Sequence, residues 1–344
     1  MIRFECDYSE GAHPRVLQKI IDTNFEQTQT YGEDSYCQKA ALLIKDKCGR
    51  QDIDVHFLSG GTQTNLTVIS AVLRPHQGVI SADSGHISVH ETGAVEATGH
   101  KVLVLPGTNG KLTAGQIQAV CDEHARDVNH EHTVQPKLVY ISNPTEIGSV
   151  YSRSELSAIS ETCRRNQLFL YMDGARLGYA LCAHENDVDL PVIADLCDAF
   201  YIGGTKLGTL FGEALVICRQ ELKPDFRYIM KQKGALLAKG RLLGLQFLAL
   251  FEDDLYFDIA HHANDMAQLI KEACERKGYH FMIPSETNQQ FPILPDAVLL
   301  RLADDFTYSF WEKTDEMHSA VRFCTSWATT QEQVKELATA IEQD

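Results

Sequence analysis

Two charged side chains, Asp173 and Lys206, each lie beside an apolar run of strand length and a turn of small residues. LFLYM precedes Asp173, and DAFYI precedes the segment GGTKLG that contains Lys206. In an open α/β sheet, ligands bind beyond the carboxyl ends of the strands. An acid and a lysine that follow two such strands can therefore face one ligand.

This combination of side chains suits one cofactor chemistry. A lysine amine can form a Schiff base with an aldehyde, and a buried carboxylate can hold the protonated ring nitrogen that makes pyridoxal phosphate an electron sink. The chain between Asp173 and Lys206 is long enough for a helix that returns to a neighbouring strand. The two residues therefore indicate a pyridoxal 5'-phosphate site.

A phosphate-binding motif is expected where GGTQTN follows the predicted strand Val55–Ser59 and precedes the apolar helix LTVISAVL. Backbone amides and the helix dipole favour an anion at such a helix start. Gly61 allows the anion to approach closely, and Thr62 adds a hydroxyl. Glycine turns open many helices that bind nothing, so this motif counts only together with Asp173 and Lys206.

The composition argues against nucleic acids and membranes as partners. A net charge of −16 opposes binding to nucleic acid or to anionic membranes. No apolar run reaches the length of a membrane span, and the first residues lack the apolar region of a secretory signal. The ten cysteines are scattered without a C-x-x-C pair, which indicates reduced thiols in a cytoplasmic protein. Three histidines in EHARDVNHEHTVQ lack the framing of a metal site, so no metal is expected.

Helices and strands are expected to alternate over the first two thirds of the chain. One helix should begin at Pro14, another should span Ser35–Lys47, and later ones should lie near 113–127 and 152–166. The strands between them, including Lys137–Asn143, predict right-handed βαβ units and a largely parallel sheet.

The last third should form a second, smaller unit. From about Asp225 the spacing predicts a long connecting helix and a second amphipathic helix. AVLLRL and VRFCTSW, with a terminal helix from about Thr330, indicate a strand–helix–strand–helix order. We expect a large domain at 1–244, with residues 1–20 able to pack on the small domain, and a small α/β domain at 245–344.

The motifs in their order resemble the L-threonine aldolase and β-eliminating lyase family of pyridoxal-phosphate enzymes. The resemblance covers nearly the whole chain and implies the aspartate-aminotransferase-like fold (fold type I), with a seven-stranded, mostly parallel sheet between helices and a small C-terminal α/β domain. The motifs are YGED at 31–34, GGTQTN at 60–65, SGHISVHETGA at 84–94, YMDGAR at 171–176, GGTKLG at 203–208 and VRF at 321–323.

The resemblance also implies roles for single residues. His86 would lie over the cofactor ring as a catalytic residue, beside Lys206 and Asp173. Arg176 and Arg322 would bind the carboxylate of a small amino-acid substrate, a task that suits a planar guanidinium. Tyr31 would reach the cofactor of a neighbouring subunit, which implies a homodimer or homotetramer with the active site at the subunit interface.

The implied reaction is aldol cleavage of a β-hydroxy-α-amino acid, of the L-threonine or L-allo-threonine type, to glycine and an aldehyde. A β-elimination or another lyase reaction on a different amino acid is the alternative with the same cofactor. A catalytically inactive binding protein with this fold is an alternative of another class. A nicotinamide-dependent oxidoreductase would need a G-x-G-x-x-G turn, which GGTQTN does not match.

Three segments depart from the family pattern. The family has an asparagine–threonine–histidine turn after the strand that matches KLVYIS, whereas this chain has SNPTEIG, so that Thr145, Glu146 or His86 alone must act there. Cys6 stands where the family has a serine that contacts the carboxylate. Lys239 and Arg241 are the remaining candidates for phosphate contacts in a segment that is richer in arginine in the family.

Overall fold

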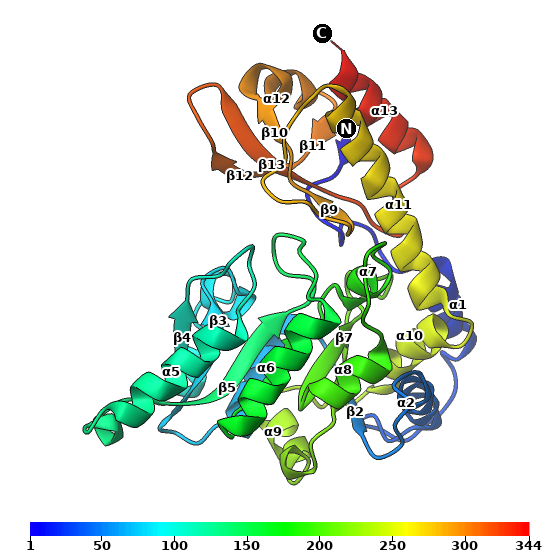
Figure 1. The fold of residues 1–344 in the computed structure, drawn as a ribbon. Coiled ribbons are helices and arrows are strands. Elements are labelled where there is room, and N and C mark those ends of the chain that lie inside the picture. Colours follow the sequence, from blue (N-terminus) through cyan, green and yellow to red (C-terminus); the bar gives the residue numbers. More distant parts are fainter. Residues whose placement is uncertain (344) are drawn as a thin grey trace.

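The computed structural model describes residues 1–343, which form a larger and a smaller body joined by one long helix (Figure 1). The larger body contains a seven-stranded sheet in the order β2-β8-β7-β6-β5-β3-β4. Strand β8 is antiparallel to both of its neighbours, and the other strands run in one direction. The predicted mostly parallel sheet is confirmed. Its strands are β2 (Asp54–Leu58), β3 (Gln77–Ala82), β4 (Lys101–Leu105), β5 (Gln135–Ser142), β6 (Phe169–Asp173), β7 (Ala199–Gly203) and β8 (Glu213–Ile217).

Both faces of this sheet are covered, because successive side chains of a strand point to opposite faces. Met172 and Phe200 belong to one apolar cluster, whereas their neighbours Tyr171 and Tyr201 belong to the other. Helices α5, α6 and α8 lie along one face (Figure 1). The helices of this body are α1 (Pro14–Asp22), α2 (Ser35–Lys47), α3 (Gly61–Val72), α4 (His86–Val89), α5 (Ala114–Arg126), α6 (Arg153–Arg165), α7 (Leu177–Leu181), α8 (Leu190–Leu196), α9 (Phe226–Gln232) and α10 (Arg241–Phe251), with short 3-10 helices at Glu96–Thr98, His130–His132 and Gln220–Leu222.

Helices α1 and α2 begin where the sequence predicts them. Pro14 occupies the first turn of α1, where its missing N–H costs no intrahelical bond. The side chain of Asp34 caps α2 by accepting hydrogen bonds from the backbone N–H groups of Tyr36 and Cys37. These local signals account for both predicted helix starts.

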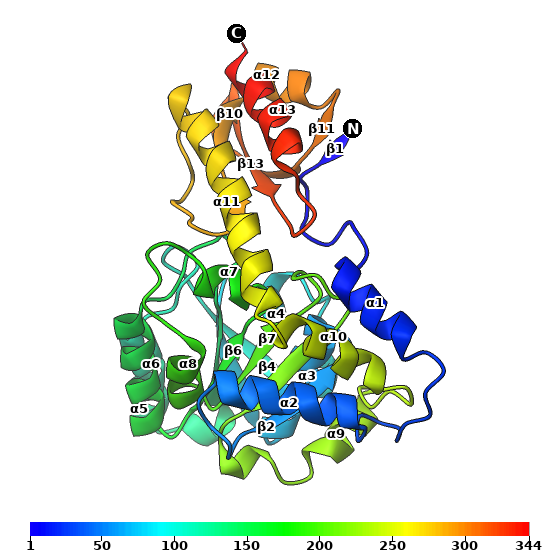
Figure 2. The same cartoon turned by 90° about the vertical axis from the view of Figure 1, so that its right-hand side faces the viewer.

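The smaller body contains an antiparallel sheet with β13 at its centre and the parallel pair β1 and β11. The first strand and the last helix both lie in this body, and α11 runs from it to the larger one (Figure 2). Phe4 belongs to its apolar core, whereas Val16 belongs to the core of the larger body. Its elements are β1 (Ile2–Arg3), α11 (Leu255–Arg276), β9 (Gln289–Gln290), β10 (Ile293–Pro295), α12 (Asp296–Leu302), β11 (Phe306–Thr307), β12 (Ser309–Lys313), β13 (His318–Cys324) and α13 (Gln331–Glu342).

Consecutive helices α10 and α11 confirm the two helices predicted after Asp225, and the expected domain boundary at 244/245 falls inside α10. The predicted strand AVLLRL is wrong, because this segment is helix α12. Val298, Leu299 and Leu302 are buried at helical spacing and face the small core. None of the helices within residues 1–343 combines the length and the hydropathy of a membrane-spanning segment.

Candidate active site

A pocket of about 310 Å³ opens beyond the carboxyl ends of β5, β6 and β7. This volume lies within the usual range for sites that bind small molecules. Six of the residues selected from the sequence line this one pocket, although they come from four separate segments. They are Gly61, Thr62, His86, Asp173, Arg176 and Lys206.

Asp173, the last residue of β6, is held as a buried carboxylate by four donors. The hydroxyls of Tyr201 and Tyr140 donate at 2.5 and 2.6 Å, and the side chain of Asn65 and the N–H of Ala175 donate at 3.0 Å. Burial alone would raise the pKa of Asp173, but the nearby His86 and these hydrogen bonds outweigh it and lower the pKa. The pocket therefore holds a fixed negative charge at neutral pH.

Lys206 lies in the short connection between β7 and β8 and points into the pocket. Burial and repulsion from Arg176 lower its pKa, against the attraction of Asp7, Asp173 and Glu213. Burial also raises the pKa of Glu213 to about 8, although Thr205 Oγ and the Gly204 N–H donate to its carboxylate at 2.9 and 3.0 Å. A lowered pKa favours the neutral amine, which is the nucleophilic form of a lysine.

His86 is oriented by the carboxylate of Glu91. Its Nδ1 lies 2.9 Å from Oε1 of Glu91, whose side chain is fully buried. Asn65 Nδ2 donates both to Glu91, at 2.8 Å, and to Asp173. Because a carboxylate accepts at Nδ1, the second ring nitrogen, Nε2, is the one available for other contacts.

The start of α3 belongs to the pocket lining, where an anion could be received. Gly60 is its N-cap and supplies no side-chain hydrogen bond to the first amides, so these amides and the positive end of the helix dipole are left for another partner. A Cβ atom at Gly61 would lie 3.0 Å from the hydroxyl of Tyr201, which is already committed to Asp173. Glycine therefore keeps this approach open.

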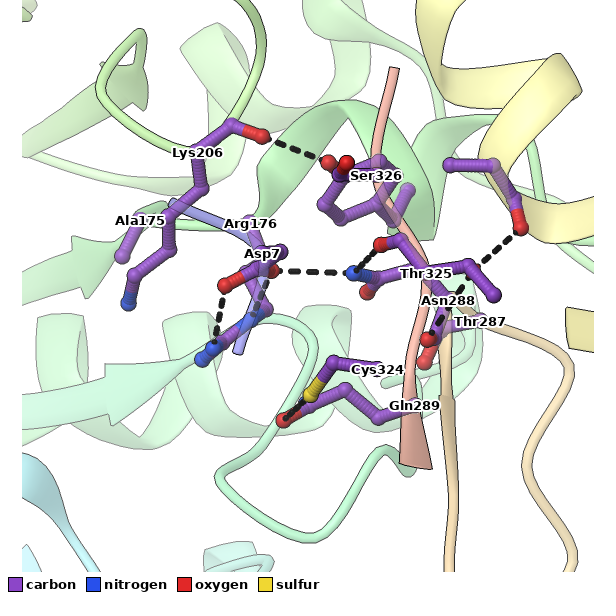
Figure 3. Close-up of polar contacts among 12 residues, drawn as sticks. Asp7, Ala175, Arg176, Lys206, Thr287, Asn288, Gln289, Cys324, Thr325 and Ser326 are labelled. Atoms are coloured by element: carbon purple, nitrogen blue, oxygen red, sulfur yellow. Dashed lines mark hydrogen bonds and ion pairs between the residues drawn. The ribbon is translucent and has the colours of Figure 1, made fainter. Parts of the chain in front are cut away.

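Arg176 is held by a residue that the sequence analysis did not select. Asp7 accepts from Nε and Nη2 of Arg176 at 2.7 and 2.9 Å, and it also accepts from Nδ2 of Asn288 at 2.9 Å (Figure 3). No residue within 1–343 accepts a hydrogen bond from Nη1 of Arg176. This nitrogen remains available for a substrate carboxylate.

The other two predicted binding residues lie outside the pocket lining. Arg322 donates from Nη2 to the carbonyl of Glu5 at 2.9 Å, and its buried Nε has no partner among the described residues. Tyr31 is 40% exposed on another part of the surface, with Nζ of Lys231 4.5 Å from its ring centroid. Within one subunit, Tyr31 therefore does not reach this pocket.

Among the candidate residues of the three segments that depart from the family pattern, only those of the turn after β5 line the pocket. Thr145 and Glu146 both line the pocket, whereas Cys6, Lys239 and Arg241 do not. The guanidinium of Arg241 donates to backbone carbonyls of residues 24 and 26 at 3.2 and 2.9 Å. Arg241 therefore braces a loop within this subunit.

Sequence analysis missed the residues that hold the charged groups in place, namely Asp7, Asn65, Tyr140, Tyr201 and Glu213. One signal was present for Tyr140. It lies two residues before Ser142, which pairs with Asp173 on the neighbouring strand, and residues two apart on a strand share a face. Asp7 lies in an irregular segment and gave no such signal.

Comparison with known proteins agrees with this geometry. The beta-eliminating lyase family model matches residues 12–297. A low specificity L-threonine aldolase of Pseudomonas sp. is 33% identical over 98% of this chain and 96% of its own. One of Escherichia coli K12 is 28% identical over 63% of this chain and 64% of its own.

A solved structure of a threonine aldolase from Leishmania major is 46% identical and superposes with a TM-score of 0.97 over 99% of both chains. An aspartate aminotransferase of Thermus thermophilus, 14% identical, superposes with a TM-score of 0.70 over 99% of this chain and 91% of its own, which shows the shared fold alone. The fold, the family model and the identity over nearly the whole chain lead to one conclusion: the chain belongs to the beta-eliminating lyase family.

Proposed function

We propose that this protein is a pyridoxal-phosphate-dependent carbon–carbon lyase that cleaves a β-hydroxy-α-amino acid, of the L-threonine or L-allo-threonine type, to glycine and an aldehyde. One observation carries the proposal. A single pocket joins Lys206, Asp173 and the start of α3, in a chain that aligns over nearly its whole length with low specificity L-threonine aldolases.

The pocket fits the proposed cofactor at three points. The amides at Gly61 and Thr62 suit its phosphate, the carboxylate of Asp173 suits a protonated ring nitrogen, and the amine of Lys206 suits its aldehyde. When bound, pyridoxal phosphate supplies the electron sink that accepts the electron pair of a broken bond at Cα.

The residues of the chain bind and orient the substrate. Asp173, fixed by its four donors, keeps a negative charge where the ring nitrogen would lie. His86, oriented by Glu91, would offer the flat face of its imidazole to the ring. Arg176 offers Nη1 to the substrate carboxylate, and Arg322 would join it only after a rearrangement, because it lies outside the pocket lining.

We also propose a cytoplasmic homodimer or homotetramer. Tyr31 is exposed and lies away from the pocket of its own subunit, which supports a role at a partner's pocket. All ten cysteines are free, which supports a reducing compartment. Sedimentation of the active enzyme tests the assembly, because an active monomer would contradict a role for Tyr31 across an interface.

The reaction is tested by product analysis. The purified chain with added pyridoxal phosphate should release glycine and acetaldehyde from L-threonine or L-allo-threonine. Ammonia and a keto acid in place of glycine would indicate β-elimination. A chain that binds the cofactor and releases no product from a panel of β-hydroxy-α-amino acids would be an inactive binding protein.

A further inference from the structure

The turn after β5, from Ser142 to Ser149, borders the pocket. Two of its side chains, Thr145 and Glu146, line the pocket. Thr145 is buried, and its Oγ lies 2.8 Å from Oγ of Ser149 and accepts from the Ser149 N–H at 3.2 Å. The hydroxyl of Thr145 therefore closes the turn.

Glu146 is held differently, because both of the hydrogen bonds that its carboxylate accepts from other residues fall on one oxygen. Oε1 accepts from the hydroxyl of Ser142 at 2.6 Å and from the backbone N–H of His86 at 2.9 Å. Neither of these donors is a cation. No other residue within 1–343 donates a hydrogen bond to Oε2. The carboxyl group is thus fixed in orientation and keeps one oxygen for a proton.

The surroundings of Glu146 suit proton transfer. Burial and the negative charge of Asp173 raise the pKa of Glu146, whereas the hydrogen bonds from Ser142 and His86 lower it, and the net shift is upward. The other titratable groups around it are Tyr140, Tyr151 and the His86–Glu91 pair, and Arg176 and Lys206 line the same pocket. A carboxyl group with a pKa closer to neutrality can both take and return a proton.

We propose that Glu146 is the catalytic base that takes the proton from the β-hydroxyl of the substrate, an inference that rests on the proposed function. In this step the hydroxyl proton moves to Oε2 and the Cβ–O bond becomes the aldehyde carbonyl. The Cα–Cβ bond breaks, and its electron pair goes to the Cα side. One proton then adds to Cα to give glycine, and Glu146 releases its proton, so that no proton is gained or lost overall.

Thr145 and His86 are the two other candidates for this base, and Glu146 suits the role better. Thr145 has a hydroxyl that cannot act as a base at neutral pH and is already engaged in the turn. His86 keeps a free Nε2, because only Nδ1 contacts Glu91, but the family resemblance places its ring against the cofactor, and the experiment below separates His86 from Glu146. Glu146 is the remaining group in this turn that can accept a proton.

The experiment uses Glu146→Gln in the full chain loaded with pyridoxal phosphate. The amide oxygen of glutamine can still accept from Ser142 and His86, so the turn is preserved while the base is lost. Cleavage of L-threonine or L-allo-threonine should fall by about 100-fold or more. Exchange of the glycine α-proton in deuterated water involves no β-hydroxyl and should stay close to that of the unmodified chain.

A second readout is the pH profile of kcat/KM. A base must be deprotonated to act, so cleavage by the unmodified chain should decline as the pH falls through the pKa of Glu146. The residual cleavage by Glu146→Gln should lack this acid limb. Glu123→Gln, the same change on the exposed face of α5, is the matched control and should alter neither reaction.

The outcomes separate the possible failures. Equal loss of cleavage and of glycine exchange would assign Glu146 a structural role and overturn the inference. Unchanged cleavage would do the same and would direct attention to His86. If the unmodified chain exchanges the glycine proton but cleaves no β-hydroxy-α-amino acid, the proposed function itself fails, and the inference fails with it.

Discussion

Asp7 and Arg176 are 169 residues apart in the chain and form a bidentate ion pair, with 2.7 Å between Oδ2 and Nε and 2.9 Å between Oδ1 and Nη2. The side chain of Asp7 is fully buried, and that of Arg176 is 12% exposed. The pair joins the N-terminal segment to the loop after β6, and Asn288 adds the smaller body through a third hydrogen bond (Figure 3). Three distant parts of the chain therefore meet at one carboxylate.

Replacement of Asp7 by asparagine should destabilise the fold. The change leaves the guanidinium of Arg176 buried without a counter-charge, which typically costs about 3–5 kcal/mol. Urea denaturation of Asp7→Asn and of the unmodified chain measures the difference. Asp265→Asn, on the exposed side of α11, is the matched control. A decrease of less than about 1 kcal/mol in the free energy of unfolding would show that the Asp7–Arg176 pair contributes no more than an exposed ion pair.

The same pair predicts how stability depends on acid. Burial would raise the pKa of Asp7, but Arg176 and Lys206 outweigh it and lower the pKa below the ordinary value of 3.8. The contribution of Asp7 is therefore complete above that value and is lost as the pH falls through the lowered pKa. Unfolding free energies measured from neutral pH down to about pH 3 should decline less for Asp7→Asn than for the unmodified chain.

Lys206→Ala should remove covalent attachment of the cofactor. After incubation with pyridoxal phosphate and reduction with borohydride, intact-mass analysis should show the added mass on the unmodified chain and not on the variant. Lys335 is exposed on α13, and the control variant Lys335→Ala should gain the same added mass as the unmodified chain. Full labelling of Lys206→Ala would show that another lysine is the attachment site.

Asp173→Asn should retain the fold and lose most of the activity. The amide keeps an oxygen for Tyr140 or Tyr201 but removes the charge that would face the ring nitrogen. The loss of a buried charge partner, about 3–5 kcal/mol, corresponds to a decrease in kcat/KM of at least about 100-fold. Steady-state kinetics measure kcat/KM of Asp173→Asn, and circular dichroism checks that the variant is folded. Near-normal activity would contradict the role given to Asp173.

Gly61→Ala should weaken cofactor binding. The added methyl group would lie 3.0 Å from the hydroxyl of Tyr201, which cannot withdraw without loosening its hydrogen bond to Asp173. Such crowding costs about 1–3 kcal/mol. Titration with pyridoxal phosphate should show a raised Kd, whereas Gly115→Ala, which meets no atom within 4 Å, should not. An unchanged Kd for Gly61→Ala would show that Tyr201 can move.

Much of the larger body follows from local signals. The strand that ends at Asp173 is a short, fully apolar run, and the capping residues before α2 and at the start of α1 lie within a few residues of the helices they begin. The rule that ligands bind at the carboxyl ends of parallel strands then brings Asp173 and Lys206 together. These inferences need only short stretches of sequence and a known sheet geometry.

The remaining features depend on contacts between distant segments. AVLLRL has five apolar residues among six, a pattern that fits a strand as well as a helix, and the packing of Leu299 and Leu302 against the small core selects the helix α12. The partner of Arg176 could not be found, because Asp7 lies in a segment without regular spacing. In both cases the information lies in the tertiary structure.

The antiparallel position of β8 has a consequence for the order in which the site assembles. Lys206 lies in a hairpin, in which Gly203 pairs with Glu213 and the Gly204 N–H donates to the Gly212 carbonyl at 3.0 Å. Hairpins close over short chain distances, whereas the Asp7–Arg176 pair must wait until a loop of 169 residues has closed. We therefore expect Lys206, the proposed attachment point of the cofactor, to be positioned early during folding and Arg176, the proposed ligand of the substrate carboxylate, to be positioned late. A partly folded chain would then be able to hold the proposed cofactor before it could select a substrate.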